Sequence, residues 1–77
     1  MEKEELLKLN NVLINPDGFK VLEIILTKLC AFDFSINRDA EYKEIFLQLG
    51  KKEVGFWLLD CIFHANKEMY LKLIERN

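Results

Sequence analysis

One run of residues in the second half of the chain, Val54–Phe63 (VGFWLLDCIF), constrains the fold more than any other feature. At 100° per residue its apolar side chains point to nearly every side of a helix, and only Glu53, Asp60 and His64 form a narrow polar strip. A helix that is apolar on all sides normally lies among other elements. With 77 residues, the chain can build one small core, so we expect a single domain, residues 1–77, with this helix at its centre.

Three other segments have the periodicity of amphipathic helices. The first covers about Glu2–Ile14. The second begins after Asn15, a preferred N-cap that is followed by proline at the first helical position, and it runs to about Cys30. Its expected buried side is Phe19, Leu22, Leu26 and Leu29, widened by Ile25 and Cys30, and its expected solvent side is Lys20, Glu23, Thr27 and Lys28. The last helix, Lys67–Arg76, follows Asn66 as its N-cap.

The long helix is predicted over about Ala40–His64, with Asp39 as its cap. A helix that continued from there to the end of the chain would exceed the usual length for a globular domain, so we favour a break near Asn66. Residues 31–38 alternate apolar and polar side chains but have no partner strand, and we expect a loop that tucks Phe32 and Phe34 under the bundle. The predicted fold class is all-α, a small bundle of three to four helices with a long, largely buried third helix.

Composition excludes several classes of protein. The net charge of −2 does not suit a non-specific nucleic-acid binder. No apolar run approaches the roughly 20 residues that span a bilayer, and the acidic start MEKEE does not resemble a signal peptide. We therefore expect no membrane association. Two cysteines, Cys30 and Cys61, fit reduced, buried thiols better than a disulfide or a redox pair.

Asp60 and His64 are the nearest approach to a chemical site, because residues four apart are neighbours on a helix. They would supply half a metal site or an acid–base pair, but a zinc site needs three or four ligands and the chain has one histidine. We favour a simple ion pair over chemistry here. We predict no catalytic residues, no metal ligands and no cofactor.

The lysines near the middle of the chain leave a second interpretation open. In that interpretation Lys43, Lys51 and Lys52 contact DNA as in a helix-turn-helix protein, although glutamates balance them. The segment Gly50–Gly55 lacks the order of a phosphate-binding loop and follows no strand. We place Lys51 and Lys52 in solvent. We interpret Gly50 and Gly55 as points where a neighbouring backbone approaches closely, or as a bend near Gly55.

Aromatic side chains are numerous for so short a chain, with six phenylalanines, two tyrosines and one tryptophan. Such residues form cores, but they are also enriched where one protein buries itself in another. The residues expected at the centre of packing or of an interface are Trp57, Phe56, Phe63 and Tyr70, together with the glycines Gly50 and Gly55.

Two short patterns occur in the chain. The first is Pro16-Asp17-Gly18 followed by Val21-Leu22 and then Cys30, and the second is Gly50-Lys51-Lys52-Glu53-Val54-Gly55 followed by Leu58-Leu59. Together they resemble the pattern of a family of small helical proteins of tailed bacteriophages and prophages. The resemblance covers about residues 15–62. Departures from the family pattern are Leu49, where the family has glutamate, and a longer apolar tail through Ile74.

The resemblance implies a phage-encoded helical protein of the virion or its assembly, and it brings no catalytic residues. We accordingly expect a non-enzymatic protein that binds itself or a larger virion or assembly protein, is a homo-oligomer, and resides in the virion or in the cytoplasm of the bacterial host. The alternative is a small cytoplasmic regulator that binds DNA or a transcription factor.

Overall fold

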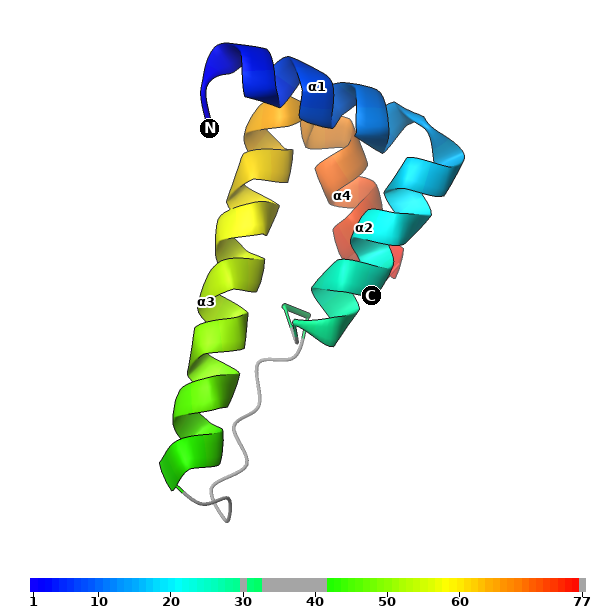
Figure 1. The fold of residues 1–77 in the computed structure, drawn as a ribbon. Coiled ribbons are helices and arrows are strands. Elements are labelled where there is room, and N and C mark those ends of the chain that lie inside the picture. Colours follow the sequence, from blue (N-terminus) through cyan, green and yellow to red (C-terminus); the bar gives the residue numbers. More distant parts are fainter. Residues whose placement is uncertain (30, 33–41, 77) are drawn as a thin grey trace.

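The described residues of the chain form four α-helices, shown in Figure 1 as a computed structural model. They are α1 (Lys3–Ile14), α2 (Pro16–Lys28), α3 (Tyr42–Ala65) and α4 (Lys67–Arg76). The structure describes residues 1–29, 31–32 and 42–76. In Figure 1, α1 lies across one end of the molecule, and α2, α3 and α4 extend away from it, with α3 much the longest. The all-α class, the helix order and the separate last helix are confirmed.

The α1–α2 junction follows the local signal in the sequence. The Asn15 side chain accepts hydrogen bonds from the backbone N–H groups of Asp17 (2.9 Å) and Gly18 (3.2 Å), and Pro16 occupies the first helical position. These bonds satisfy two of the four N–H groups that a helix start leaves unpaired. Asn15 therefore ends one helix and begins the next with no intervening loop.

Asn66 has the same role at the α3–α4 junction. Its Oδ1 accepts from the backbone N–H of Met69 at 3.1 Å, as predicted for an N-cap. Its Nδ2 donates to Oδ1 of Asn10 at 2.8 Å, and this bond ties the corner between α3 and α4 to α1. The break at Asn66 lets α4 fold back along α3, because a continuous helix would carry the apolar side of residues 69–74 into solvent.

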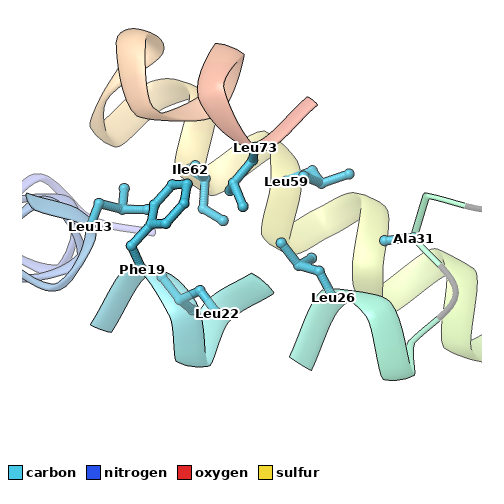
Figure 2. Packing of buried hydrophobic residues seen from close by; sticks show 8 residues of the cluster. All are labelled: Leu13, Phe19, Leu22, Leu26, Ala31, Leu59, Ile62 and Leu73. Atoms are coloured by element: carbon cyan, nitrogen blue, oxygen red, sulfur yellow. The ribbon is translucent and has the colours of Figure 1, made fainter. Parts of the chain in front are cut away.

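All four helices contribute to one hydrophobic cluster (Figure 2). Ile62 of α3 and Leu73 of α4 lie at its centre with Leu13 of α1 and Leu26 of α2, and each of these four side chains is fully buried. The remaining members are Phe19, Leu22, Ala31 and Leu59, with Phe32 packed against the edge. Phe32 thus packs as predicted for the loop, whereas Phe34 and Cys30 lie outside the described residues.

The long helix is buried on one side only, which corrects the expectation that it is largely buried. Leu59, Cys61 and Ile62 are buried, but most of the described side chains of α3 are exposed, including seven large apolar ones: Phe46, Leu47, Leu49, Val54, Phe56, Trp57 and Phe63. There are two physical reasons. The other helices cover only part of the circumference of α3, which leaves Val54, Phe56, Trp57 and Phe63 of its second half exposed. The second reason is length. α3 has 24 residues, while the other helices have 12, 13 and 10, so its first half continues past the ends of α2 and α4 (Figure 1).

The dimensions of the molecule agree with this open packing. Its radius of gyration is 13.6 Å, whereas a compact domain of this length would have about 11.5 Å. Its accessible surface is 5880 Å², whereas a compact monomer of this mass would expose about 4,900 Å². The chain is therefore less compact than a typical monomer of its size, and large apolar side chains are among those it leaves exposed.

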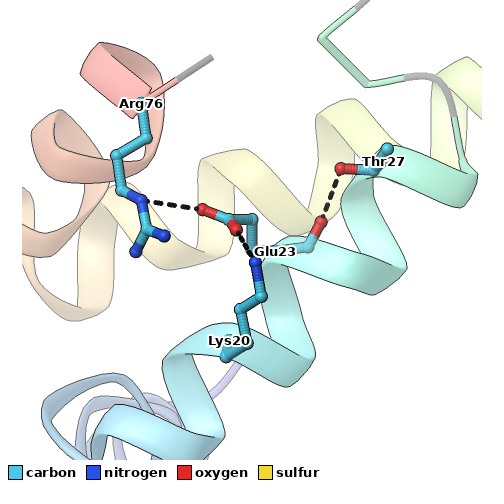
Figure 3. A network of polar contacts seen from close by, with 4 residues as sticks. All are labelled: Lys20, Glu23, Thr27 and Arg76. Atoms are coloured by element: carbon cyan, nitrogen blue, oxygen red, sulfur yellow. Dashed lines mark hydrogen bonds and ion pairs between the residues drawn. The ribbon is translucent and has the colours of Figure 1, made fainter.

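A charged cluster joins α2 to α4 (Figure 3). The Glu23 carboxylate is buried, with Oε1 2.8 Å from Nζ of Lys20 and Oε2 3.2 Å from Nε of Arg76. The Arg76 guanidinium also lies over the ring of Phe19, 5.5 Å from its centre. The prediction that Glu23 faces solvent is wrong, and the same is true of Ile25, predicted buried and found exposed. α4 covers the Glu23 side of α2, and helical periodicity alone gives no information on where another helix docks.

The cluster predicts a pH dependence of stability. The hydrogen bond from Lys20, with the charges of Arg76 and Lys20, holds the pKa of the Glu23 carboxyl below its ordinary value of 4.5, although desolvation opposes this. A lowered pKa in the folded state means that the stabilisation is complete above the unfolded pKa and is lost as pH falls through the folded pKa. We expect Glu23→Gln to lower the melting temperature at about pH 7 and to lose that effect as the pH falls below the ordinary pKa range of a glutamate carboxyl. If the melting temperature of Glu23→Gln stays below that of the wild type by the same amount at acidic pH, the stabilising role of the ionised Glu23 carboxylate is contradicted.

Candidate protein interface

Among the described residues, an apolar groove lies between α3 and α4. Its volume is about 560 Å³, and the residues that line it are Ala31, Phe32, Phe56, Leu59, Asp60, Phe63, Tyr70 and Ile74. Three of the four aromatic residues expected at an interface, Phe56, Phe63 and Tyr70, therefore meet in one place. We call this surface the aromatic groove.

The rings of the groove hold one another in position. The Phe63 ring packs edge-to-face against Tyr70, with centroids 5.3 Å apart and an interplanar angle of 81°. It packs in the same manner against His64 at 5.5 Å. Edge-to-face aromatic pairs stabilise by about 0.5–1.5 kcal/mol beyond the burial of their area. Because α3 and α4 are joined at the capped Asn66 corner, the two walls of the groove have a fixed relation to each other.

Among the described residues that line the groove, Asp60 is the one with a charged side chain. Its Oδ1 lies 3.4 Å from Nε2 of His64, and both side chains are well exposed. An exposed pair at this spacing contributes little to stability. Within the described residues there is no group of three or more histidine, cysteine or acidic side chains placed to hold a metal ion. The pair therefore places polar, exposed groups at the edge of the apolar groove.

Trp57 and Gly50 lie away from the groove. Helical spacing places them on one stripe of α3 with Leu47 and Val54, and all four positions are exposed. Trp57 is 54 % exposed, and Leu47 is 66 % exposed. We call these four residues the outer stripe. The structure thus separates the predicted interface residues into two surfaces on different sides of α3.

The two glycines of α3 have different surroundings. A Cβ placed on Gly55 would lie 2.8 Å from Cβ of Ala31 and 3.4 Å from Cβ of Leu29, so the end of α2 and the turn after it approach α3 here. A Cβ on Gly50 would have no described atom within 4 Å. Gly55 permits a close contact inside the molecule, as expected, and Gly50 lies at an open position.

This difference predicts opposite effects of one substitution. Alanine stabilises a helix interior by about 1 kcal/mol relative to glycine, so Gly50→Ala should stabilise the fold by that amount. In Gly55→Ala the same gain is offset by about 1–3 kcal/mol of overpacking against Ala31. Urea titrations of the two variants at low protein concentration measure the difference, expected at about 1–3 kcal/mol in favour of Gly50→Ala. Equal stabilities would show that no close approach exists at Gly55.

The lysines that suggested DNA binding do not form a common surface among the described side chains. Lys51 is exposed, but Lys52 is only 7 % exposed, so its predicted place in solvent is wrong. The side chain of Lys43 lies outside the described residues.

Cys61 is a free, buried thiol, as expected.

Comparisons with known proteins add no functional information. No protein-family model, no curated protein and no solved structure matches this chain. In the part of the chain that the structure describes, no helix combines the length and the apolar character needed to cross a membrane. The aromatic groove and the outer stripe are therefore the features from which a function is inferred.

Sequence reasoning identified the aromatic residues but not their division between two surfaces. It missed Ile74, Ala31 and Asp60 as members of the groove lining. The spacing of Phe56, Asp60 and Phe63 on one side of α3 was a usable signal for that wall. The opposite wall depends on how α4 folds back, which is fixed by the Asn66 corner, by the burial of Leu73 and by the Arg76–Glu23 ion pair.

Proposed function

We propose that this chain is a non-enzymatic protein-interaction module of a tailed phage or prophage, which binds a segment of a larger virion or assembly protein in its aromatic groove. The observation that carries the proposal is the gathering of Phe56, Phe63 and Tyr70 around one open apolar groove. The resemblance of residues 15–62 to small phage proteins supports the phage context. The virion and the host cytoplasm are its two proposed locations.

The shape and chemistry of the groove indicate the kind of segment it takes. Two helices form its long walls, and such a groove accepts an amphipathic helix that inserts apolar side chains spaced three or four residues apart. Aromatic residues in a concave apolar surface are the usual anchors of binding energy. The exposed Asp60 carboxylate beside them favours a basic residue at the edge of the bound helix.

The experiment places a photo-crosslinking amino acid, p-benzoylphenylalanine, at Phe63 in the groove. A matched chain carries it at Ile14, an exposed apolar position on α1. Both chains are produced in bacteria that make the phage, and adducts are identified by mass spectrometry. We expect position 63, but not position 14, to form one discrete adduct with a larger protein through a helical segment with the predicted spacing. A set of adducts common to both positions, or none at position 63, would contradict the proposal.

The regulator alternative is tested in the same preparation. Phosphate contacts make DNA affinity fall steeply with salt concentration, so a DNA-binding chain would be retained on DNA at low salt and released at high salt. We expect no retention above that of an acidic control protein. Salt-sensitive retention that is lost in Lys51→Ala would favour the regulator instead.

A further inference from the structure

We propose that the outer stripe of α3, formed by Leu47, Gly50, Val54 and Trp57, is the seam of a homodimer in which the α3 helices of two copies pack together. The four residues follow the spacing i, i+3, i+7, i+10, which is the alternating three- and four-residue repeat of a two-helix seam. The next position of the repeat, Cys61, is buried inside the chain, so the exposed stripe ends where the core begins.

The stripe is complementary to itself. Trp57 and Leu47 project bulky exposed side chains, while Gly50 leaves an open position between them, with no described atom within 4 Å of where its Cβ would be. Two helices that pack through such a stripe place large side chains of one in the space beside the glycine of the other. A two-fold dimer uses the same patch on both copies, so one stripe must supply both parts of the fit. This argues for a second copy as the occupant.

The side chains of the stripe are accessible to that occupant. Leu47, Val54 and Trp57 are 66 %, 51 % and 54 % exposed. A stable dimer buries about 800 Å² on each partner. The first half of α3, which carries Leu47 and Gly50 of the stripe, extends beyond α2 and α4, so a second long helix can lie along it without meeting them (Figure 1).

The inference rests on the proposed function in one respect, namely that the chain acts by associating with proteins. It assigns a different partner to a different surface, since the stripe shares no residue with the groove lining. Groove crosslinking and self-association can therefore fail separately, and each result identifies which of the two assignments is wrong.

The experiment is sedimentation equilibrium of the purified chain over about a hundredfold range of concentration, because dimer formation depends on concentration by mass action. We expect a mass near twice the chain mass of 9.2 kDa at high concentration. Gly50→Glu places a charge in the seam, at a position where its side chain has room, and should weaken the dimer at least about a hundredfold while circular dichroism is unchanged. Leu7→Glu, which puts the same charge on an exposed apolar position of α1, should leave the dimer intact.

A second variant protects the test against misfolding. Val54→Lys introduces the opposite charge at the next position of the stripe and should also give a monomer. Gly50→Ala is a further check, because it should stabilise the helix and yet weaken the dimer. A wild-type chain that is monomeric throughout, or a dimer that survives both Gly50→Glu and Val54→Lys, would overturn the inference. Loss of the dimer in Leu7→Glu but not in the stripe variants would overturn it as well.

Discussion

Ile62→Ala is expected to lower the free energy of unfolding by about 2–5 kcal/mol, the largest single effect in the chain. Ile62 is 0 % exposed, and Figure 2 places it where side chains of α1, α2 and α4 converge. Truncation removes the buried methyl and methylene groups and leaves a cavity that three helices must collapse to fill. A domain of 77 residues has about 4–12 kcal/mol of stability in total, so the variant should be near the limit of folding.

The control is Ile24→Ala, the same substitution on the exposed side of α2. We expect a change within about 0.5–1 kcal/mol, since surface truncations away from special features have small effects. Urea titration followed by circular dichroism measures both variants. Similar losses in the two would mean that the cluster around Ile62 is not the core of the fold.

Gly18→Ala is the second large expected effect, a loss of about 2–3 kcal/mol from overpacking. A Cβ at this position would lie 2.4 Å from the carbonyl oxygen of Val12 and 2.8 Å from its Cγ1. The carbonyl belongs to the backbone and accepts a hydrogen bond from the Asn15 N–H at 3.2 Å, so it cannot move without disturbing the α1–α2 corner. The hydrogen bonds that the backbone N–H groups of residues 17 and 18 donate to the Asn15 side chain would be strained at the same time.

The double variant Gly18→Ala/Val12→Ala identifies the source of the loss. It removes the contact with Cγ1 but retains the contact with the carbonyl, so we expect only partial recovery of stability by urea titration. Val12 is exposed, so Val12→Ala alone should have little effect. Full recovery in the double variant would show that the backbones of the two helices do not limit this position.

Much of the fold was predictable because its boundaries are set locally. The side chains of Asn15 and Asn66 cap the helices that follow them. Such N-caps can be recognised in a single sequence. Leu22 and Leu26 are buried as their periodicity predicts, because the apolar side of α2 has one place to go.

What the sequence did not reveal depends on docking between helices. Glu23 and Lys20 have the same polar character in the sequence, yet only Glu23 is buried, because α4 brings Arg76 to it from the other end of the chain. The apolar character of Val54–Phe63 predicted enclosure, but the three shorter helices can cover only one side of a 24-residue helix. The uncovered remainder became the groove wall and the outer stripe, which are the candidate sites.

The central claim is that another protein chain covers the exposed apolar surface of α3. Trp57, the single tryptophan of the sequence, lies on that surface and reports on its environment directly. The measurement is the fluorescence emission and acrylamide quenching of Trp57 over about a hundredfold dilution of the purified protein. We predict blue-shifted, protected emission at high concentration and red-shifted, accessible emission on dilution, with Gly50→Glu accessible throughout. Emission and quenching of Trp57 that indicate a solvent-exposed ring at every concentration, and that are identical in Gly50→Glu, would contradict the claim.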